Sequence, residues 1–119
     1  MATYRVNEAS TARYTATLVD ETETPIPAAD LTALTLYLYE PVSAGVVNSR
    51  NNQNVLNTNG VTVNSAGLLT WTISALDTTM VNATKEIETH IATFTFTYAS
   101  GNKVGRHEVI LSIDNLLGV

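Results

Sequence analysis

Two histidines, His90 and His107, have the widest chemical range in this sequence, because imidazole can bind a metal, accept a proton or act as a general base. Both share the phase of the inward-facing residues in the last two predicted strands, so they could form half of a metal site or a pH-dependent pair. A metal site needs a third and usually a fourth ligand, and no residue is spaced to supply either. The sequence therefore predicts no bound metal and favours a local hydrogen-bonding role for both rings.

The densest group of carboxylates, Asp20, Glu21 and Glu23, could bind calcium together with amide or backbone oxygens. Its spacing lacks the register of an EF-hand loop, and a solvated turn is the interpretation we favour. The chain has no cysteine, no Gly-x-Ser-x-Gly elbow and no glycine-rich phosphate loop. We therefore predict no catalytic residue, no cofactor and no enzymatic activity, and a catalytic domain using His90 and His107 is the least favoured alternative.

The composition excludes further classes of function. The chain has 119 residues, which suits one domain, and a formal net charge of -5 with 14% charged residues. Its six lysines and arginines are scattered, whereas a nucleic-acid or anionic membrane surface needs them clustered. No apolar run approaches the roughly 20 residues that span a bilayer, and the amino terminus lacks the pattern of a secretory signal. We predict a soluble protein without nucleic-acid or membrane partners.

Alternation of apolar and polar residues with a period of two dominates the sequence and predicts strands. The clearest alternating segments are residues 13–20, 31–40, 68–74, 88–99 and 103–114. The last two flank the turn Ser100-Gly101-Asn102 and form a long hairpin, and Trp71 is the expected anchor of the core. Short edge strands are expected at 46–47 and 61–63, and a helical turn at 76–81. The pattern predicts an all-β fold, an immunoglobulin-like antiparallel β-sandwich of about seven strands with a long C-terminal hairpin.

The predicted strands leave a polar loop and an amino-terminal arm outside the core. We expect a single sandwich domain at residues 12–119 and an arm at residues 1–11 that could lie on a neighbouring subunit. Residues 46–65 form the longest connection, and loops are where binding residues concentrate. The candidate partner-binding residues come from this loop and the arm, and they are Asn48, Arg50, Asn51, Asn52, Gln53, Asn54, Asn57, Tyr4 and Arg5.

A carbohydrate-binding or adhesin-like module is the alternative function. Exposed Tyr37, Tyr39 and Tyr98 could stack on the apolar faces of sugar rings while loop amides bond hydroxyl groups. Their strand phase argues instead that at least one tyrosine face packs against the second sheet or a neighbour. Both interpretations stay open at the level of the sequence.

The asparagine-rich residues 47–63 are followed by Gly67-Leu68-Leu69-Thr70-Trp71, and further motifs lie at residues 14–20, 34–39 and 88–94 and in Asn115-Leu116-Leu117. Together these segments resemble small immunoglobulin-like virion structural proteins of tailed bacteriophages. The resemblance implies a non-enzymatic head decoration protein, a neck or tail accessory domain such as a head-tail connector component, or a module similar to the amino-terminal domain of baseplate upper proteins. It also implies a location in the virion and partners among capsid, neck or tail subunits, bound in symmetric multiple copies.

Overall fold

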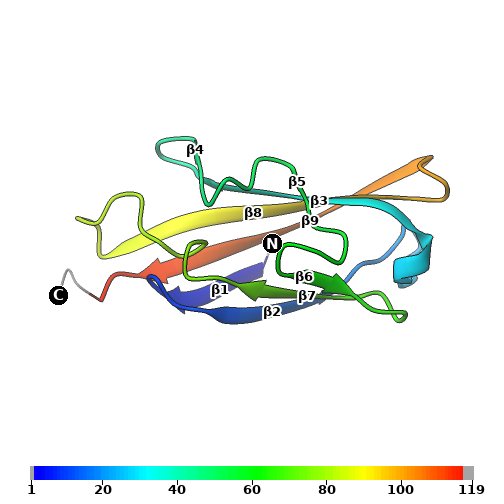
Figure 1. Ribbon diagram of the computed structural model, residues 1–119, viewed down its shortest axis with the longest axis horizontal. Helices are drawn as coiled ribbons and strands as arrows, with labels where there is room; N and C mark the ends of the chain where they lie inside the picture. Colours follow the sequence, from blue (N-terminus) through cyan, green and yellow to red (C-terminus); the bar gives the residue numbers. More distant parts are fainter. Residues whose placement is uncertain (1, 117–119) are drawn as a thin grey trace.

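The computed structural model describes residues 2–116, which form two packed β-sheets (Figure 1). The larger sheet contains six strands, in the order β1 (Ala2–Asn7), β9 (Lys103–Asp114), β8 (Ile87–Tyr98), β3 (Leu31–Glu40) and β4 (Gly45–Val46), with β5 (Gln53–Asn54) also paired to β3. The smaller sheet contains three strands, in the order β2 (Ala12–Thr17), β7 (Leu68–Ile73) and β6 (Val61–Val63). A single 3-10 turn, η1 (Ala28–Asp30), is the one helical element among the described residues.

The predicted all-β, two-sheet architecture is confirmed, with nine strands in the described part of the chain where about seven were expected. The likeness to the immunoglobulin fold in particular stays a prediction. Met1, the first residue of the predicted arm, lies outside the described residues. So do residues 117–119, which include the end of the predicted domain and the last residue of the motif Asn115-Leu116-Leu117.

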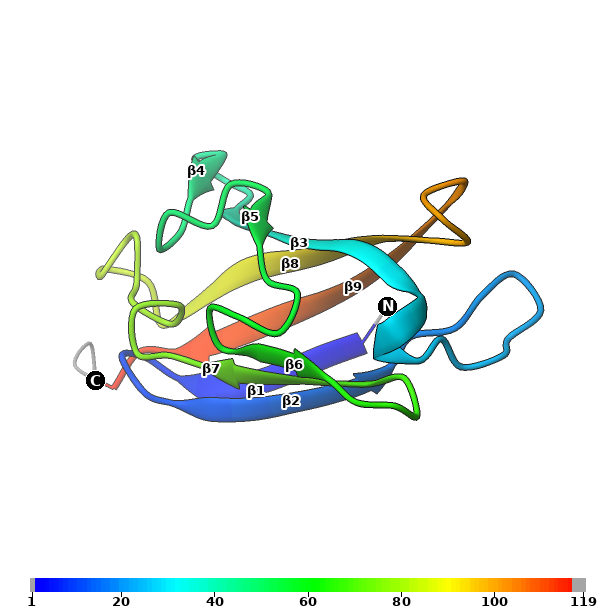
Figure 2. The ribbon, with the colours of Figure 1, turned by 45° about the vertical axis from the view of Figure 1, so that its right-hand side comes forward.

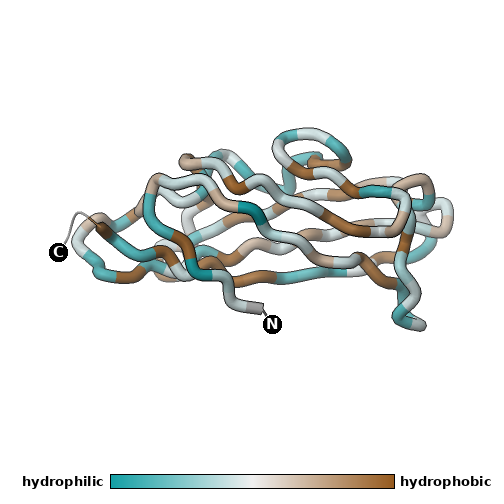
Figure 3. Tube along the Cα trace, turned by 90° about the horizontal axis from the view of Figure 1, so that it is seen from below, coloured by the Kyte–Doolittle hydropathy of each residue, from teal (hydrophilic) through white to brown (hydrophobic). Residues whose placement is uncertain are grey.

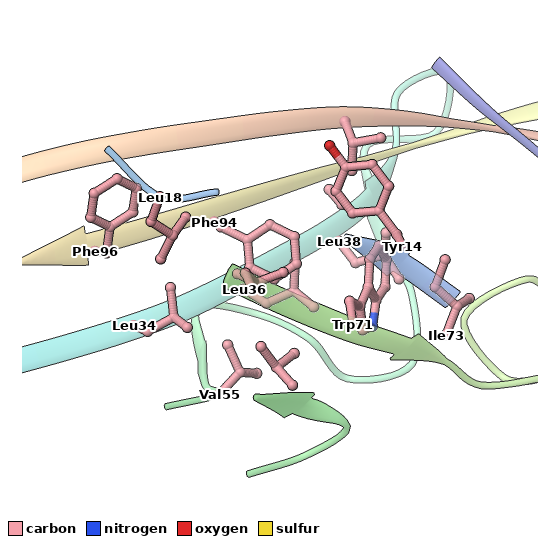
Figure 4. Packing of buried hydrophobic residues seen from close by; sticks show 14 of the residues in the cluster. Tyr14, Leu18, Leu34, Leu36, Leu38, Val55, Trp71, Ile73, Phe94 and Phe96 are labelled. Atoms are coloured by element: carbon pink, nitrogen blue, oxygen red, sulfur yellow. The ribbon is translucent and has the colours of Figure 1, made fainter. Parts of the chain in front are cut away.

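The core lies between the sheets because apolar and polar residues alternate along the strands (Figure 3). Leu34, Leu36 and Leu38 of β3 are fully buried on one face, as their spacing predicts. Trp71 of β7, the predicted anchor, is also fully buried and meets Phe94 of β8 edge to face, with ring centroids 5.5 Å apart (Figure 4). Burial of one such side chain contributes about 1.5–3 kcal/mol, so this cluster is a main source of stability.

The predicted C-terminal hairpin is confirmed, since β8 and β9 pair along their whole length of 12 residues. Its turn places Ala99, Ser100 and Gly101 at positive φ. Opposite Phe96 in the ladder stands Gly105, where a β-carbon would lie 2.4 Å from two carbons of the Phe96 ring. Glycine at this position therefore lets the aromatic ring cover the backbone of β9.

Residues 2–11 do not form an arm outside the sandwich, contrary to the sequence prediction. Ala2–Asn7 form β1, which pairs with β9 in parallel at the margin of the larger sheet. Val6 is buried, and the Tyr4 hydroxyl donates to the carbonyl of Arg13 in β2 at 2.7 Å. The sandwich is thus not wholly antiparallel, and its first strand joins the margins of both sheets.

Two shorter predictions have different outcomes. The edge strand expected at 61–63 is present as β6, and the one expected at 46–47 is present one residue earlier, as β4. The helical turn expected at 76–81 is replaced by a non-helical turn, in which the backbone N–H of Asp77 donates to the carbonyl of Ser74 at 3.0 Å. Among residues 2–116, no helix has the length and apolar character needed to cross a membrane.

Candidate functional site

A buried ion pair between Arg50 and Asp77 anchors the predicted contact loop to the core. Arg50 Nε donates to Asp77 Oδ1 at 2.6 Å and Nη2 donates to Oδ2 at 3.1 Å, and the two side chains are 6% and 0% exposed. Asn48 Nδ2 and the backbone N–H of Ser74 also donate to this carboxylate, at 2.8 and 2.9 Å. Burial alone would raise the pKa of Asp77, but these hydrogen bonds outweigh it and hold that pKa below the ordinary value of 3.8.

Arg50 also reaches the outer part of the loop. Its Nη1 donates to Gln53 Oε1 at 2.9 Å and to the carbonyl of Asn59 at 3.1 Å. The guanidinium carbon lies 6.0 Å from the centre of the Trp71 ring, within the range of cation–π attraction. A pocket of about 320 Å³ lies beside the guanidinium, lined by Asn48, Arg50, Gln53, Asn59, Gly60, Thr72 and Ser74. Figure 2 shows the chain passing from β5 in the larger sheet to β6 in the smaller one.

The asparagines of the loop mainly shape its turns. Asn48, Asn52, Asn57 and Asn59 have φ values of 51–53°, a left-handed conformation that asparagine tolerates better than most residues. Asn57 Oδ1 also accepts the backbone N–H of Val63 at 2.8 Å. The high asparagine content, which led to the prediction of a contact surface, is therefore largely explained by the turns of the loop.

The remaining predicted contact residues of the loop differ in exposure. Gln53 and Asn54 form β5, and Asn54 Oδ1 accepts the backbone N–H of Leu56 at 3.2 Å. Asn51 and Asn52 are exposed, and their side chains make no hydrogen bond to the described residues. The side chains of Asn51 and Asn52 are thus available to a partner, whereas those of Arg50 and Asn48 are engaged within the chain.

Both predicted contact residues of the amino-terminal segment have partners within the chain. The Tyr4 ring meets Tyr14 edge to face at 5.8 Å, in addition to its bond with β2. Arg5 Nε donates to Asp114 Oδ2 at 2.8 Å across the parallel pair, with 73% of the Arg5 side chain exposed. Arg5 remains accessible to a partner, whereas Tyr4 is part of the sandwich.

His90 is enclosed in a buried polar network. Its Nδ1 lies 3.0 Å from the carbonyl of Asp77, and its Nε2 lies 2.5 Å from Glu88 Oε2, with both side chains 0% exposed. The Glu88 carboxylate also accepts the backbone N–H groups of Val81 and Asn82, at 2.7 and 2.8 Å. The network ties the turn at 75–82 to β8, and the His90 ring is fully buried within it.

His107 is not a partner of His90. In the ladder His107 stands opposite Phe94 and His90 opposite Leu111, so the two rings are roughly 14 Å apart along the strands. His107 Nε2 and the Tyr14 hydroxyl are 2.7 Å apart, and their rings stack with centroids separated by 5.9 Å. Burial lowers the pKa of His107 and raises that of Tyr14 from their ordinary values. The pair joins β2 to β9 across the sandwich.

Acidification below about pH 6.5 is expected to destabilise the fold through His107. The unfolded chain takes up a proton near the ordinary imidazole pKa of 6.5, whereas the folded ring stays neutral to lower pH. The unfolded state then binds more protons, so stability falls as the pH drops through this window. Because the ring is only half-buried, we expect a loss below about 1 kcal/mol, measured as a shift of the urea midpoint. A His107→Gln variant should show a smaller shift, and an equal shift would contradict the assignment.

The carboxylates proposed as calcium ligands form a solvated turn. Asp20 Oδ1 accepts the backbone N–H groups of Thr22 and Thr24, at 2.8 and 3.0 Å. Glu21 accepts from Lys103 Nζ at 2.6 Å and from the Tyr98 hydroxyl at 3.0 Å. Within residues 2–116, no group of three or more histidine, cysteine or acidic side chains could hold a metal ion.

The outer face of the larger sheet carries an apolar row that the sequence analysis did not identify. The register places Val46 opposite Tyr39, Tyr39 opposite Ile91 and Ile91 opposite Ile110, with Thr3 of β1 beyond it. Val46 is 41% exposed, and the other members of the row from β3, β8 and β9 are half-buried. We call Val46, Tyr39, Ile91 and Ile110 the outer apolar row.

The tyrosines proposed to bind sugar do not form one surface. Tyr37 and Tyr39 stack on the outer face with centroids 4.9 Å apart, so each ring gives one of its faces to the other. Tyr98 is buried at 8% exposure and points into the sandwich, which corrects its prediction as an exposed residue. The aromatic platform is therefore reduced to one stacked pair.

Three residues of the candidate site, Glu88, Asp77 and Gly60, were not identified from the sequence, and they differ in whether the sequence pattern could have indicated them. Glu88 stands two residues before His90 in the inward phase of β8, so a buried acid beside a buried histidine could have been read from the alternation. Asp77 lies in a turn with no such signal, and Gly60 lines a pocket formed by distant segments.

No known protein family, curated protein sequence or solved structure matches this chain.

Proposed function

We propose that the chain is a non-enzymatic structural protein of a tailed bacteriophage virion that binds neighbouring capsid, neck or tail subunits. The outer apolar row is the observation that carries this proposal. An antiparallel sheet with one face in water normally presents polar residues there, yet this row crosses four strands in register. Such a continuous apolar strip is typical of a surface that is covered in an assembly.

The surroundings of the row support the same role. The neighbouring outward positions of β8 are threonines, at Thr89, Thr93, Thr95 and Thr97, so the face is β-branched and uncharged along this strand. Along β8, this surface can pack on another subunit without burying a charge. Multiple copies in a ring or shell add weak contacts together, so one small face per subunit is enough.

The resemblance of the sequence to immunoglobulin-like virion proteins is what supports capsid, neck or tail subunits as the partners. It favours a decoration or accessory role in the head, neck or tail, with the virion as the location. In this role the outer apolar row contacts the neighbouring subunit, and Asn51, Asn52 and Arg5 supply polar contacts at its margins.

The test is incorporation into particles. Mass spectrometry of purified virions should detect the chain in many copies, and its absence from assembled particles would overturn the proposal. An Ile91→Lys variant, supplied in place of the natural chain, should reduce its copy number per particle by more than about tenfold, since a loss of 1.4 kcal/mol has that effect. Thr15→Lys on the outer face of the smaller sheet is the matched control, and equal urea midpoints show that both variants fold.

A further inference from the structure

One donor of Arg50 is left without a partner. Among the described residues Nε, Nη1 and Nη2 make four hydrogen bonds, and the second N–H of Nη2 makes none. Arg50 is only 5% exposed, and its guanidinium is held in place by Asp77, Gln53 and the Asn59 carbonyl. The free N–H is therefore fixed in direction before any ligand arrives, which lowers the entropy lost on binding.

Gly60 keeps this nitrogen accessible. A β-carbon at residue 60 would lie 3.8 Å from Arg50 Nη2, and the glycine has φ of +87° with its carbonyl bonded to the N–H of Thr72 at 2.7 Å. The same β-carbon would lie 3.1 Å from the Thr72 carbonyl oxygen, and a side chain at this positive φ would strain the turn. The absence of a side chain at Gly60 thus leaves room beside Nη2, within the pocket of about 320 Å³.

The pocket wall combines further donors and acceptors. Gln53 accepts from Arg50 through Oε1, which leaves its Nε2 as a donor. Asn48 and Asn59 donate through Nδ2 to Asp77 and to the Asn54 carbonyl, which leaves their Oδ1 atoms as acceptors. Thr72 and Ser74 complete the lining. Their hydroxyls can donate and accept, and Ser74 Oγ already accepts from Asn48 Nδ2 at 3.5 Å.

We propose that this pocket binds a neutral, hydroxyl-rich ligand the size of one sugar residue. The charge of Arg50 is already neutralised by Asp77, and the chain has a net charge of -5, so an anion gains little there. Hydroxyl groups both donate and accept, as the mixed lining requires. The volume is at the lower end of small-molecule pockets, about 300–1,000 Å³, which suits a single ring. The proposal is independent of the virion role.

The test is a nuclear magnetic resonance titration of the full chain with methyl glycosides of glucose, galactose, mannose and N-acetylglucosamine. At least one sugar should shift the Gly60 amide and the Arg50 Nε–H signals saturably, with a Kd of about 10 mM or tighter. Arg50→Lys, which keeps a positive charge beside Asp77, and Gln53→Ala should each weaken this binding about tenfold. Gln53→Ala keeps the proposal testable if Arg50→Lys fails to fold. Thr15→Ala, outside the pocket on the outer face of the smaller sheet, should bind as the natural chain does.

Three results would overturn the pocket assignment. The first is the absence of saturable shifts with every glycoside. The second is binding that is lost in Tyr37→Ala or Tyr39→Ala but kept in Gln53→Ala, which would place the sugar on the outer tyrosine pair. The third is saturable binding of acetate in preference to the sugars, which would make the pocket a carboxylate site. None of these results changes the expected incorporation into virions.

Discussion

Replacing Asp77 with alanine is expected to lower the free energy of unfolding by about 3–5 kcal/mol. The change leaves the Arg50 guanidinium buried at 5% exposure without its counter-ion. It also removes the acceptor of Asn48 Nδ2 and of the Ser74 N–H. Since domains of this size have about 5–15 kcal/mol of stability, the variant should be close to unfolding. Urea denaturation followed by the fluorescence of the single tryptophan, Trp71, measures the loss.

The exposed pair Arg5–Asp114 is the matched control for this prediction. It has the same chemistry and a similar Nε–Oδ distance of 2.8 Å, but 73% of the arginine side chain is exposed. Asp114→Ala should therefore lower stability by less than about 1 kcal/mol. Equal losses in Asp77→Ala and Asp114→Ala would contradict the importance of burial at the internal pair.

Acid titration supplies a second signature of Asp77. Because its pKa in the folded state lies below the ordinary 3.8, the carboxylate contributes stability above that pH, and the contribution is lost as the pH falls further. The Asp77→Ala variant lacks this contribution at every pH. Its stability should therefore approach that of the natural chain as the pH is lowered through and below 3.8.

Local alternation was sufficient to predict the main strands of the fold. Leu34, Leu36 and Leu38 repeat at a spacing of two, and the same spacing continues through the hairpin of β8 and β9, where the turn residues are adjacent in sequence. Strand β1 was not predicted, because its partner strand β9 is more than one hundred residues away in the sequence. The hydrogen bond from Arg5 to Asp114, for example, spans a sequence separation of 109. Parallel strands are not joined by a short hairpin turn, so no turn motif in the sequence indicates their pairing.

The sequence identified the loop of the candidate site but not the contacts within it. Residue types can be counted along the chain, whereas the partner of each side chain depends on the fold. The asparagine content drew attention to the correct loop, but positive φ values account for Asn48, Asn52 and Asn57. The role of Arg50 depends on Asp77, 27 residues further on, in a turn whose position in space follows from β7 and β8. The outer apolar row also depends on the strand register. Neither Ile91 nor Ile110 is unusual in its own strand, and only the pairing of the strands places them side by side.

Trp71→Ala is expected to lower the free energy of unfolding by about 3–5 kcal/mol, the range for removing a large aromatic side chain from a core. The indole is 0% exposed, and its loss opens a cavity against Phe94 and removes the surface beneath Arg50. Circular dichroism must follow the unfolding, because Trp71 is the one tryptophan of the chain.

Trp71→Phe separates packing from polarity in this prediction. The buried indole Nε1 has no hydrogen-bond partner among the described residues, and an unsatisfied buried donor costs about 1–3 kcal/mol. Phenylalanine removes this donor while keeping an aromatic ring near Phe94, so the lost volume is partly offset. The expected loss is therefore less than half of that in Trp71→Ala. A Trp71→Phe variant as unstable as Trp71→Ala would show that the indole nitrogen is satisfied, by a buried water for example, and that this bond stabilises the core.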